Sequence, residues 1–562
     1  MAASLLVGCS NSTPDVVSAT SEISPPSPVA STVEPPDVKS LPAFRNVAQE
    51  RGINAAFFTD TVPERFFLPE IMGGGTCWFD FDRDGVLDVY LTNGAQFEST
   101  GLSLPANWLY RGQRDFFTLV EETIGAGDNG YGQGCAAGDF DSDGFPDLYV
   151  ANFGPNTLHQ NNGDGTFSPC DAGVEDNHWT SSVAWADLNQ DGWLDLYVTN
   201  YLLMTLQDRK VCEYDGLPGY CGPGQYSAAP DSVFLSNGDG TFREAAADLG
   251  MTESTGKGLA LVVADLNDDR LPEVYVGNDM TPNFLYEAQW NSDHTLLTYK
   301  EHAETSGVAQ SGEGMNEASM GIACADFNGD ALPDIYLTHY LNMQNTMYFN
   351  RGGLQFEDVS RRVGTASTGF PYLGFGTVPI DVNQDGLEDL FVTNGHVLGP
   401  RIQPNRMRPQ LLLNDQGRKF VDVSASMGAY FQAEWLGRGA ASADYDNDGD
   451  LDILVTHLDE PAALLESSAA SSTGFIGFEL SAQSRIPPCG AKITVKQGER
   501  SQSRSLQIGG SYLCSSDSRL LFVCSKGSPV DVRVEWPSGK SQEFRELSTG
   551  QYWRICEGRQ PW

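Results

Sequence analysis

The sequence predicts an all-β protein, a seven-bladed β-propeller with a small C-terminal β-domain. Two observations predict the propeller. A nine-residue acidic pattern occurs seven times, and each copy joins two short apolar runs, such as SVAWA before Asp187 and LYVTN after Asp195, which are typical of strands. Most copies precede a further strand, a tight turn and a strand that opens with Phe, so each repeat has four strands. Repeated four-stranded units favour a propeller, because each sheet must bury both faces against its neighbours.

The first residues resemble the end of a bacterial lipoprotein signal. Leu6, Val7, Gly8 and Cys9 are similar to a lipobox, although the basic residues and longer apolar run of a complete signal are missing. We therefore expect residues 1–9 to be a truncated signal with Cys9 as the lipidation site. The alternative is a cytosolic N-terminus with a chance Cys. Residues 10–42 are rich in Ser, Thr, Pro and Val and have no period, which predicts a flexible tether.

The charge balance excludes two classes of partner. The chain has 75 Asp and Glu against 34 Lys and Arg, a formal net charge of −41, which repels nucleic acid and anionic membranes. No run approaches the ~20 apolar residues of a membrane-spanning helix. We expect an extracytoplasmic protein, secreted or held at the cell envelope through a lipid on Cys9 alone.

The cysteines agree with an oxidising compartment. If Cys9 carries lipid, an even number of cysteines remains, which suits disulfides. Cys212 and Cys221 bracket a Gly/Pro-rich loop short enough to close. Cys77, Cys135 and Cys324 lie in apolar runs and can equally be buried thiols.

The strands that open with Phe predict how the ring closes. We expect the propeller to span residues 43–470 and the C-terminal domain residues 471–562. One Phe-led strand, at Phe44, precedes every acidic motif, and none follows the last motif at Asp444. The strand near Phe44 should therefore complete the last blade, which removes an exposed sheet edge. The other Phe-led strands lie at Phe117, Phe167, Phe242, Phe356 and Phe420, with a degenerate copy around Leu297.

The acidic motif predicts calcium binding. Side chains at positions 1, 3, 5 and 9, with the carbonyl of position 7, can surround one cation, and Ca²⁺ takes six to eight such oxygens. Gly at position 6 permits a sharp turn. The predicted ligands are Asp80, Asp82, Asp84 and Asp88; Asp139, Asp141, Asp143 and Asp147; Asp187, Asn189, Asp191 and Asp195; Asp265, Asn267, Asp269 and Glu273; Asp326, Asn328, Asp330 and Asp334; Asp381, Asn383, Asp385 and Asp389; and Asp444, Asp446, Asp448 and Asp452.

Two copies depart from the motif. Arg270 and Ala331 replace the Gly of position 6 in the fourth and fifth copies, so calcium occupancy is least secure there. The alternative for all seven copies is an Asp-rich turn that holds its own backbone without metal.

These motifs resemble a known family. The acidic loops with flanking strands resemble FG-GAP/VCBS repeats, the blade type of integrin α-subunit heads, over about residues 43–466. GFIGFEL at Gly474, PCGAKITV at Pro488, GGSYLCSSDSRLLF at Gly509 and VRVEWPSGKSQEF at Val532 resemble the ASPIC/UnbV domain. Together they match the cartilage acidic protein-like family. The resemblance implies a secreted or surface calcium-binding protein; one branch of the family accompanies natural-product gene clusters.

The C-terminal domain departs from the family pattern in its cysteines. Cys489, Cys514 and Cys524 stand where small residues are usual, and Cys556 makes a fourth. We expect two disulfides among them, with all three connectivities open.

We expect a monomeric binding or adhesion-type module for an extracellular protein or carbohydrate. The sequence has no nucleophile elbow, zinc-binding His pair, phosphate-binding Gly loop or dinucleotide fingerprint. The alternative is an extracytoplasmic enzyme, carbohydrate-active or tailoring a natural product, that uses the propeller as a scaffold.

A ring of polar residues gives a possible ligand site. An Asn or His follows the first Asp of every motif by thirteen residues, at the end of a strand. In one interpretation these side chains cap turns; in the other they line one mouth of the central channel, with Phe153, Tyr201 and Tyr340 as stacking surfaces. The ring residues are Asn93, Asn152, Asn200, Asn278, His339, Asn394 and His457.

Overall fold

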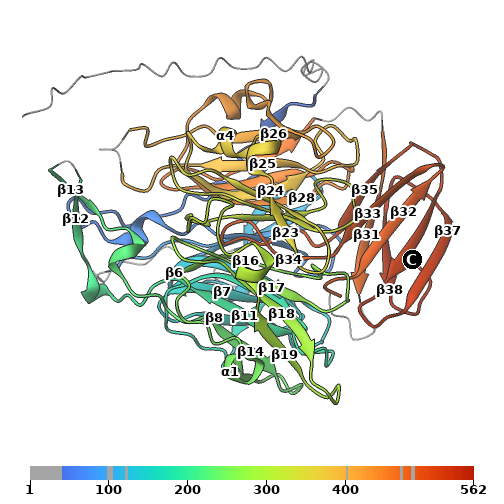
Figure 1. Cartoon of the computed structure of the whole chain (residues 1–562), viewed down its shortest axis with the longest axis horizontal. Coiled ribbons are helices and arrows are strands. Elements are labelled where there is room, and N and C mark those ends of the chain that lie inside the picture. The colour runs from blue at the N-terminus through green and yellow to red at the C-terminus, as the bar shows by residue number, and fades with distance from the viewer. Residues whose placement is uncertain are drawn as a thin grey trace, which may run out of the picture. The chain divides into compact units, whose positions relative to one another are not determined.

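The computed structural model describes residues 41–97, 106–120, 124–214, 216–399, 403–468, 473–481 and 488–561 (Figure 1). The predicted lipidation site Cys9 and residues 10–40 of the predicted tether lie outside the described residues, so both stay predictions. No described helix is long and apolar enough to cross a membrane.

The described residues form an all-β fold, which confirms the predicted class. Seven antiparallel sheets each contain four propeller strands. The first three are β2 (Thr76–Phe79), β3 (Asp88–Leu91), β4 (Trp108–Gln113) and β5 (Phe116–Val120); β6 (Tyr131–Gly138), β7 (Asp147–Phe153), β8 (Thr157–Asn161) and β9 (Phe167–Pro169); and β10 (Thr180–Ala186), β11 (Asp195–Asn200), β14 (Ser232–Ser236) and β15 (Phe242–Glu244).

The other four sheets follow the same order. They are β16 (Gly258–Ala264), β17 (Glu273–Asn278), β18 (Phe284–Trp290) and β19 (Leu297–Glu301); β20 (Ile322–Ala325), β21 (Asp334–Leu337), β22 (Thr346–Asn350) and β23 (Phe356–Asp358); β24 (Gly374–Ile380), β25 (Asp389–Asn394), β26 (Gln410–Asn414) and β27 (Phe420–Asp422); and β28 (Gly437–Ala443), β29 (Asp452–His457), β30 (Ala463–Ser467) and β1 (Phe44–Asn46). The degenerate copy around Leu297 is thus a fourth strand, as predicted.

Helices in the described residues are short and lie between strands. The α-helices are α1 (Ala246–Leu249), α2 (Ala303–Ser306), α3 (Ser360–Val363) and α4 (Thr365–Gly369), and the 3₁₀ turns are η2 (Leu68–Ile71), η4 (Leu206–Asp208), η5 (Pro223–Gln225), η6 (Ser424–Ser426) and η7 (Ala429–Gln432). A separate hairpin, β12 (Val211–Tyr214) and β13 (Leu217–Tyr220), carries the predicted Cys212–Cys221 disulfide, which the structure confirms.

The second strand of each sheet is buried on both faces. Tyr90, Tyr149 and Tyr275 lie at equivalent positions and are 0% exposed. Each hydroxyl donates to a backbone carbonyl, of Ala126, Val174 and Val308 respectively, which satisfies the buried phenol. Burial on both faces explains why these strands read as continuous apolar runs.

The first strands of the sheets form a closed ring. They contact one another in the order β2, β6, β10, β16, β20, β24, β28 and back to β2. At the closure, β1 pairs with β30, with Phe44 opposite Ser467, as the Phe-led strand predicts. The end of the propeller sequence is thus joined to its beginning by backbone hydrogen bonds.

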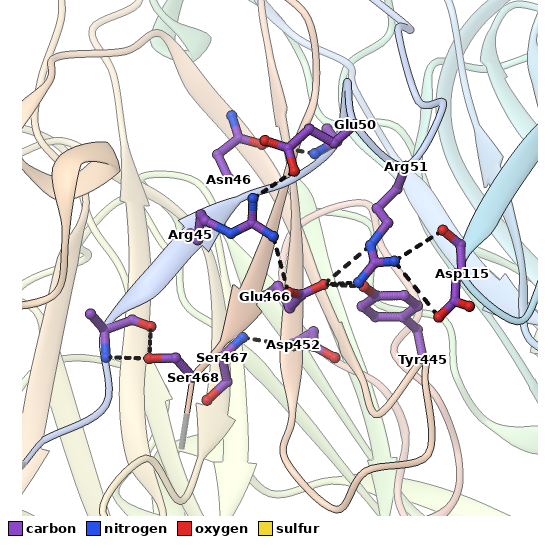
Figure 2. A network of polar contacts seen from close by, with 12 residues as sticks. Arg45, Asn46, Glu50, Arg51, Asp115, Tyr445, Asp452, Glu466, Ser467 and Ser468 are labelled. Carbon is purple, nitrogen blue, oxygen red and sulfur yellow. Dashed lines mark hydrogen bonds and ion pairs between the residues drawn. The ribbon is translucent and has the colours of Figure 1, made fainter. Parts of the chain in front are cut away.

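Polar side chains reinforce this closure (Figure 2). Arg51 donates to Glu466 Oε2 at 2.6 Å from Nη2 and to the carbonyl of Asp115 at 3.0 Å. Tyr445 donates to the same Glu466 oxygen at 2.6 Å. Arg51 therefore links the N-terminal segment to the last and first sheets, with its side chain 22% exposed.

The C-terminal domain contains two further sheets (Figure 1). One has the order β35 (Leu520–Cys524), β31 (Gly474–Ser481) and β38 (Tyr552–Cys556); the other has the order β33 (Arg500–Ser505), β32 (Lys492–Gln497), β36 (Val530–Glu535) and β37 (Ser541–Leu547). Their facing sides enclose Ile476, Phe478, Ile493 and Trp536, each no more than 1% exposed. The remaining strand, β34 (Ile508–Gly509), pairs with β16 of the propeller.

Residues 508–516, which we call the plug segment, fill the centre of the ring. A segment that contacts all seven first strands of a closed ring must lie on its axis. The contacts are Trp78 N to Ser515 O (3.2 Å), Ser515 Oγ to Cys135 O (3.2 Å), Leu513 N to Ser182 Oγ (3.3 Å), Gly510 N to Leu261 O (2.7 Å), Ser511 N to Ile322 O (2.5 Å), the ring of Tyr512 to that of Phe375 (4.9 Å between centroids) and Ser511 Oγ to Ala440 O (2.6 Å).

The predicted disulfides of the C-terminal domain are wrong. Cys489, Cys514 and Cys524 are free and buried, so two disulfides cannot form among the four cysteines of this domain. Cys514 lies in the plug segment, and Cys489 donates to the carbonyl of Val263 in β16. Cys524 of β35 pairs with Gly474, at one end of the central strand β31, and Cys556 of β38 pairs with Ser481, at its other end. The two cysteines therefore lie on opposite sides of β31 and are also separated along most of its length. Cys77, Cys135 and Cys324 are free and buried, which was the alternative left open.

Candidate metal centres

The acidic loops are numbered 1 to 7 in chain order, and six of them, all but loop 2, share the same pair of hydrogen bonds. In loop 1, Asp80 accepts from the N–H groups of positions 5 and 6, at 3.0 Å from Asp84 and 2.9 Å from Gly85. These two bonds wrap the loop backbone around the carboxylate of position 1 and fix the turn. The same two bonds recur at Asp187, Asp265, Asp326, Asp381 and Asp444.

The loops without Gly adopt the same turn. Gly85 at position 6 of loop 1 has φ +86°, and the replacements Arg270 and Ala331 have φ +76° and +69°. Left-handed backbone is costly for residues with a Cβ. The remaining bonds of loops 4 and 5 therefore hold these residues in a conformation that Gly would adopt without strain.

The ninth-position acid connects each loop to its sheet. Asp88 accepts from Phe81 N at 2.8 Å and from Gly112 N in the third strand at 2.7 Å. Burial away from water raises the pKa of this carboxylate to about 8, and the pKa values of Asp147 and Asp334 are raised to about 8 for the same reason. A cation at the loop would favour the charged form of these acids.

Three loops bring carboxylates together. In loops 1, 2 and 7, where position 3 is Asp, oxygens of positions 1, 3 and 9 lie within 4.8 Å of one another. Among the described residues, Asp139 Oδ1, Asp446 Oδ1 and Asp452 Oδ2 are buried and have no hydrogen-bond partner. Buried oxygens that lack a donor are costly, and hard oxygens grouped in this way fit a divalent cation.

Four loops have an amide at position 3. In loops 3, 4 and 6 the side-chain N–H of Asn189, Asn267 and Asn383 donates to the position-5 carboxylate at 2.9–3.0 Å, and in loop 5 Asn328 Oδ1 accepts from Asp330 N at 2.9 Å. An amide keeps an oxygen at this position with one fewer negative charge. In each of the seven loops the predicted ligands therefore lie within one turn. The carboxylates lie closest together in loops 1, 2 and 7.

Four basic residues and one tyrosine of the C-terminal domain contact loops 4 to 7, and none of these contacts was predicted. Arg500 and Arg504 lie on the same face of β33 because alternate residues of a strand share a face. Their spacing in the sequence was the one feature that could have predicted a basic face on this strand. The contacts are Lys492 Nζ to Asp268 Oδ1 (3.4 Å) and Ala331 O (2.9 Å), Arg500 Nη2 to Asp385 O (2.7 Å), Arg504 Nε to Glu388 Oε1 (2.7 Å), Arg519 Nη2 to Asp444 O (2.7 Å) and Tyr552 Oη to Asp444 Oδ2 (2.8 Å).

The seven Asn and His ring residues are interior groups. All are at most 1% exposed. Tyr201, expected as a stacking surface, is 2% exposed and packs against Trp179, while Phe153 and Tyr340 are partly buried. The amides of Asn93, Asn152, Asn200, Asn278 and Asn394 donate to the carbonyls of Ala106, Pro155, Pro230, Pro282 and Arg408, and His457 contacts that of Pro461, whereas His339 contacts the Thr346 hydroxyl. This arrangement favours turn capping over a channel rim.

Asn200→Ala is therefore expected to lower stability. Asn200 donates to Asp176 Oδ2 at 2.8 Å and accepts from Thr180 Oγ1 at 2.8 Å, so the substitution leaves buried partners unsatisfied, at a cost of about 2 kcal/mol. Urea unfolding of the two proteins measures this difference. Asn237→Ala, at an exposed turn residue, is the control and should change stability by less than about 0.5 kcal/mol. An unchanged midpoint for Asn200→Ala would contradict the capping role.

Two family models match the chain. One, described as FG-GAP-like repeat, matches residues 80–150, 139–198, 326–392 and 381–455, and the other, described as ASPIC and UnbV, matches residues 482–561. The FG-GAP-like matches omit loop 4, in which Arg270 replaces Gly.

Cartilage acidic protein 1, which combines FG-GAP repeats with an ASPIC/UnbV domain, is similar in sequence to this chain. Cartilage acidic protein 1 of Homo sapiens is 23% identical over 337 residues, covering 58% of this chain and 48% of that protein. The Mus musculus protein is 24% identical over 321 residues, covering 55% and 46%. The chain therefore spans about half the length of the curated relatives it matches.

Solved structures show more distant likeness. An Agrocybe aegerita lectin that recognises non-reducing terminal N-acetylglucosamine is 14% identical with a TM-score of 0.36, covering 70% of this chain and 95% of that one. BBS1N in complex with ARL6DN is 8% identical with a TM-score of 0.36, covering 74% and 96%. From its motifs and named relatives, this chain consists of FG-GAP-like repeats followed by an ASPIC/UnbV domain and is homologous to cartilage acidic protein 1.

Proposed function

We propose that this chain is a calcium-stabilised binding module that works outside the cytoplasm. The observation that carries the proposal is the group of carboxylate oxygens in loops 1, 2 and 7, which includes buried oxygens without a donor. Positions 1, 3, 5 and 9 with the position-7 carbonyl offer several hard oxygens. Ca²⁺ accepts such a number, whereas Mg²⁺ keeps more of its water.

The disulfide supports the proposed location. Cys212 and Cys221 are bonded, and disulfides persist in oxidising compartments. A binding role agrees with the FG-GAP-like repeats and with homology to cartilage acidic protein 1. The partner class proposed is an extracellular protein or carbohydrate.

Removing one ligand of loop 7 tests the calcium sites. Asp446→Ala deletes a buried oxygen that has no other partner in the described chain, so the protein should bind one calcium ion fewer. With a Kd near 10⁻⁴ M, stability at 1 mM calcium should fall by about 1.4 kcal/mol. Native mass spectrometry gives the stoichiometry, and thermal unfolding gives the stability.

Asp293→Ala, in an exposed turn outside the loops, is the matched control and should bind as many ions as the unmodified protein. Equal stoichiometry for Asp446→Ala and the control would refute a calcium site in loop 7. Failure of the unmodified protein to bind any calcium would refute the proposed role of calcium altogether.

A further inference from the structure

A cavity of about 450 Å³ lies between the propeller and the C-terminal domain. Its propeller wall comes from β20, β24 and loops 5 and 6, and its other wall from β33, the plug segment and β35. Ligand pockets for small molecules typically measure roughly 300–1,000 Å³ and combine apolar walls with a few polar groups. The cavity has the size of a site for a small molecule and is separate from the buried Asn and His ring.

The two arginines in its walls already pair with carboxylates, and three further lining acids, Asp326, Asp330 and Asp381, belong to loops 5 and 6. Arg504 pairs with Glu388 at 2.5 Å, with side chains 17% and 14% exposed, and Arg519 pairs with Asp517 at 2.6 Å, with side chains 12% and 8% exposed. Because both arginines are matched by carboxylates, and the acids of loops 5 and 6 face the proposed calcium ions, neither a strongly anionic nor a cationic ligand is favoured. The walls suit a neutral ligand.

Two buried acceptors in these walls have no donor in the described chain. Glu388 uses Oε1 for Arg504, but its Oε2 has no hydrogen-bond partner, and Gln502 Oε1 also has none. The Gln502 amide is fixed in direction because its Nε2 donates to the carbonyl of Val523 at 2.6 Å. An unsatisfied buried acceptor favours a ligand that donates hydrogen bonds.

The remaining lining is amphipathic. Ser501 and Ser505 of the same strand add hydroxyl groups, which both donate and accept. Leu387, Leu520 and Leu521, which are half-buried, add apolar surface beside these polar groups. A molecule with several hydroxyl groups and a C–H face matches both kinds of surface.

We propose that this cavity is a binding site for a neutral carbohydrate of one or two sugar units. Sugar hydroxyls donate to Glu388 Oε2 and Gln502 Oε1, which lie just beneath the cavity surface and are reached by a small adjustment of the wall, and the leucines cover the C–H face of the ring. The proposal rests on the binding role given above and places it at the junction of the two domains. Calcium in loops 5 and 6 holds one wall in place.

The test uses the calcium-loaded full chain and a panel of neutral monosaccharides and disaccharides, including N-acetylhexosamines, measured by isothermal titration calorimetry. At least one sugar should bind. Gln502→Leu removes one acceptor while nearly keeping side-chain volume, and it should weaken binding about tenfold or more. Gln551→Leu, at an exposed glutamine outside the cavity, should leave the affinity unchanged.

A second measurement does not depend on a variant. Sugar binding should slow hydrogen exchange in residues 501–507 and 377–382 of the unmodified protein. The proposal is overturned if no sugar in the panel binds, or if binding neither responds to Gln502→Leu nor protects these segments. Calcium stoichiometry measured on the same samples separates this failure from failure of the calcium sites, which would appear as a protein without bound calcium.

Discussion

Removal of calcium is expected to lower the melting temperature by about 10 °C. Each occupied loop contributes about 1.4 kcal/mol at 1 mM calcium if its Kd is near 10⁻⁴ M and the unfolded chain does not bind. Seven equally occupied loops give about 10 kcal/mol. Unfolding entropy of about 2.1 cal/mol/K per residue over roughly 500 residues is about 1 kcal/mol/K, which converts that energy into the expected shift.

Differential scanning calorimetry in calcium and in excess chelator measures the shift, on protein whose calcium content has been determined beforehand. Magnesium added back after chelation is the control and should restore little of the stability, because Mg²⁺ dehydrates reluctantly. Identical melting curves with and without chelator would show that the acidic loops hold their turns without a cation.

The second large effect is expected from the plug segment. Tyr512→Ala removes a ring that is 0% exposed and packs at 4.9 Å against Phe375. Truncation of a buried aromatic typically costs about 3–5 kcal/mol. Because Tyr512 belongs to the C-terminal domain sequence and packs in the propeller, its loss should also expose the domain junction to protease. Denaturant unfolding and limited proteolysis measure the two effects.

Two variants control for this experiment. Tyr512→Phe keeps the ring and loses only a hydroxyl that lies 3.7 Å from Met72 Sδ, so it should cost less than about 1 kcal/mol. Phe370→Ala removes a ring that is 45% exposed and should be similarly mild. If Tyr512→Ala were as stable as these variants, the plug segment would not hold the two domains together.

The local features of this fold could be predicted from sequence, and the long-range ones largely could not. Each acidic loop is encoded in nine consecutive residues, so its turn and its candidate ligands follow from residues close in sequence. The pairing of β1 with β30 was predictable because the Phe44 strand has no acidic motif before it. The left-handed backbone of Arg270 and Ala331 follows from their place in a repeated pattern.

The plug segment shows why prediction stopped there. Gly509, Gly510 and Ser511 mark a turn but give no sign of the seven strands around them, because those partners are dispersed along the whole chain. The same dispersal made the predicted disulfides wrong, since Cys514 lies among propeller strands and not beside the other cysteines of its domain. The Asn and His ring side chains point inward and cap the turns at the ends of their strands. Their regular spacing in the sequence does not reveal this direction, because it depends on the conformation of each turn.

The pairing of β1 with β30 also fixes an order of events during synthesis. Phe44 meets a partner, Ser467, that the ribosome adds more than 400 residues later. Bringing such distant segments together requires closing a very long loop, which slows folding. Until then β1 is an unpaired strand and the growing sheets have open edges, which favour association with other chains. The plug segment is synthesised after all the propeller strands. The first strands that line the axis of the ring therefore remain uncovered, and open to aggregation, for longer than the other strands.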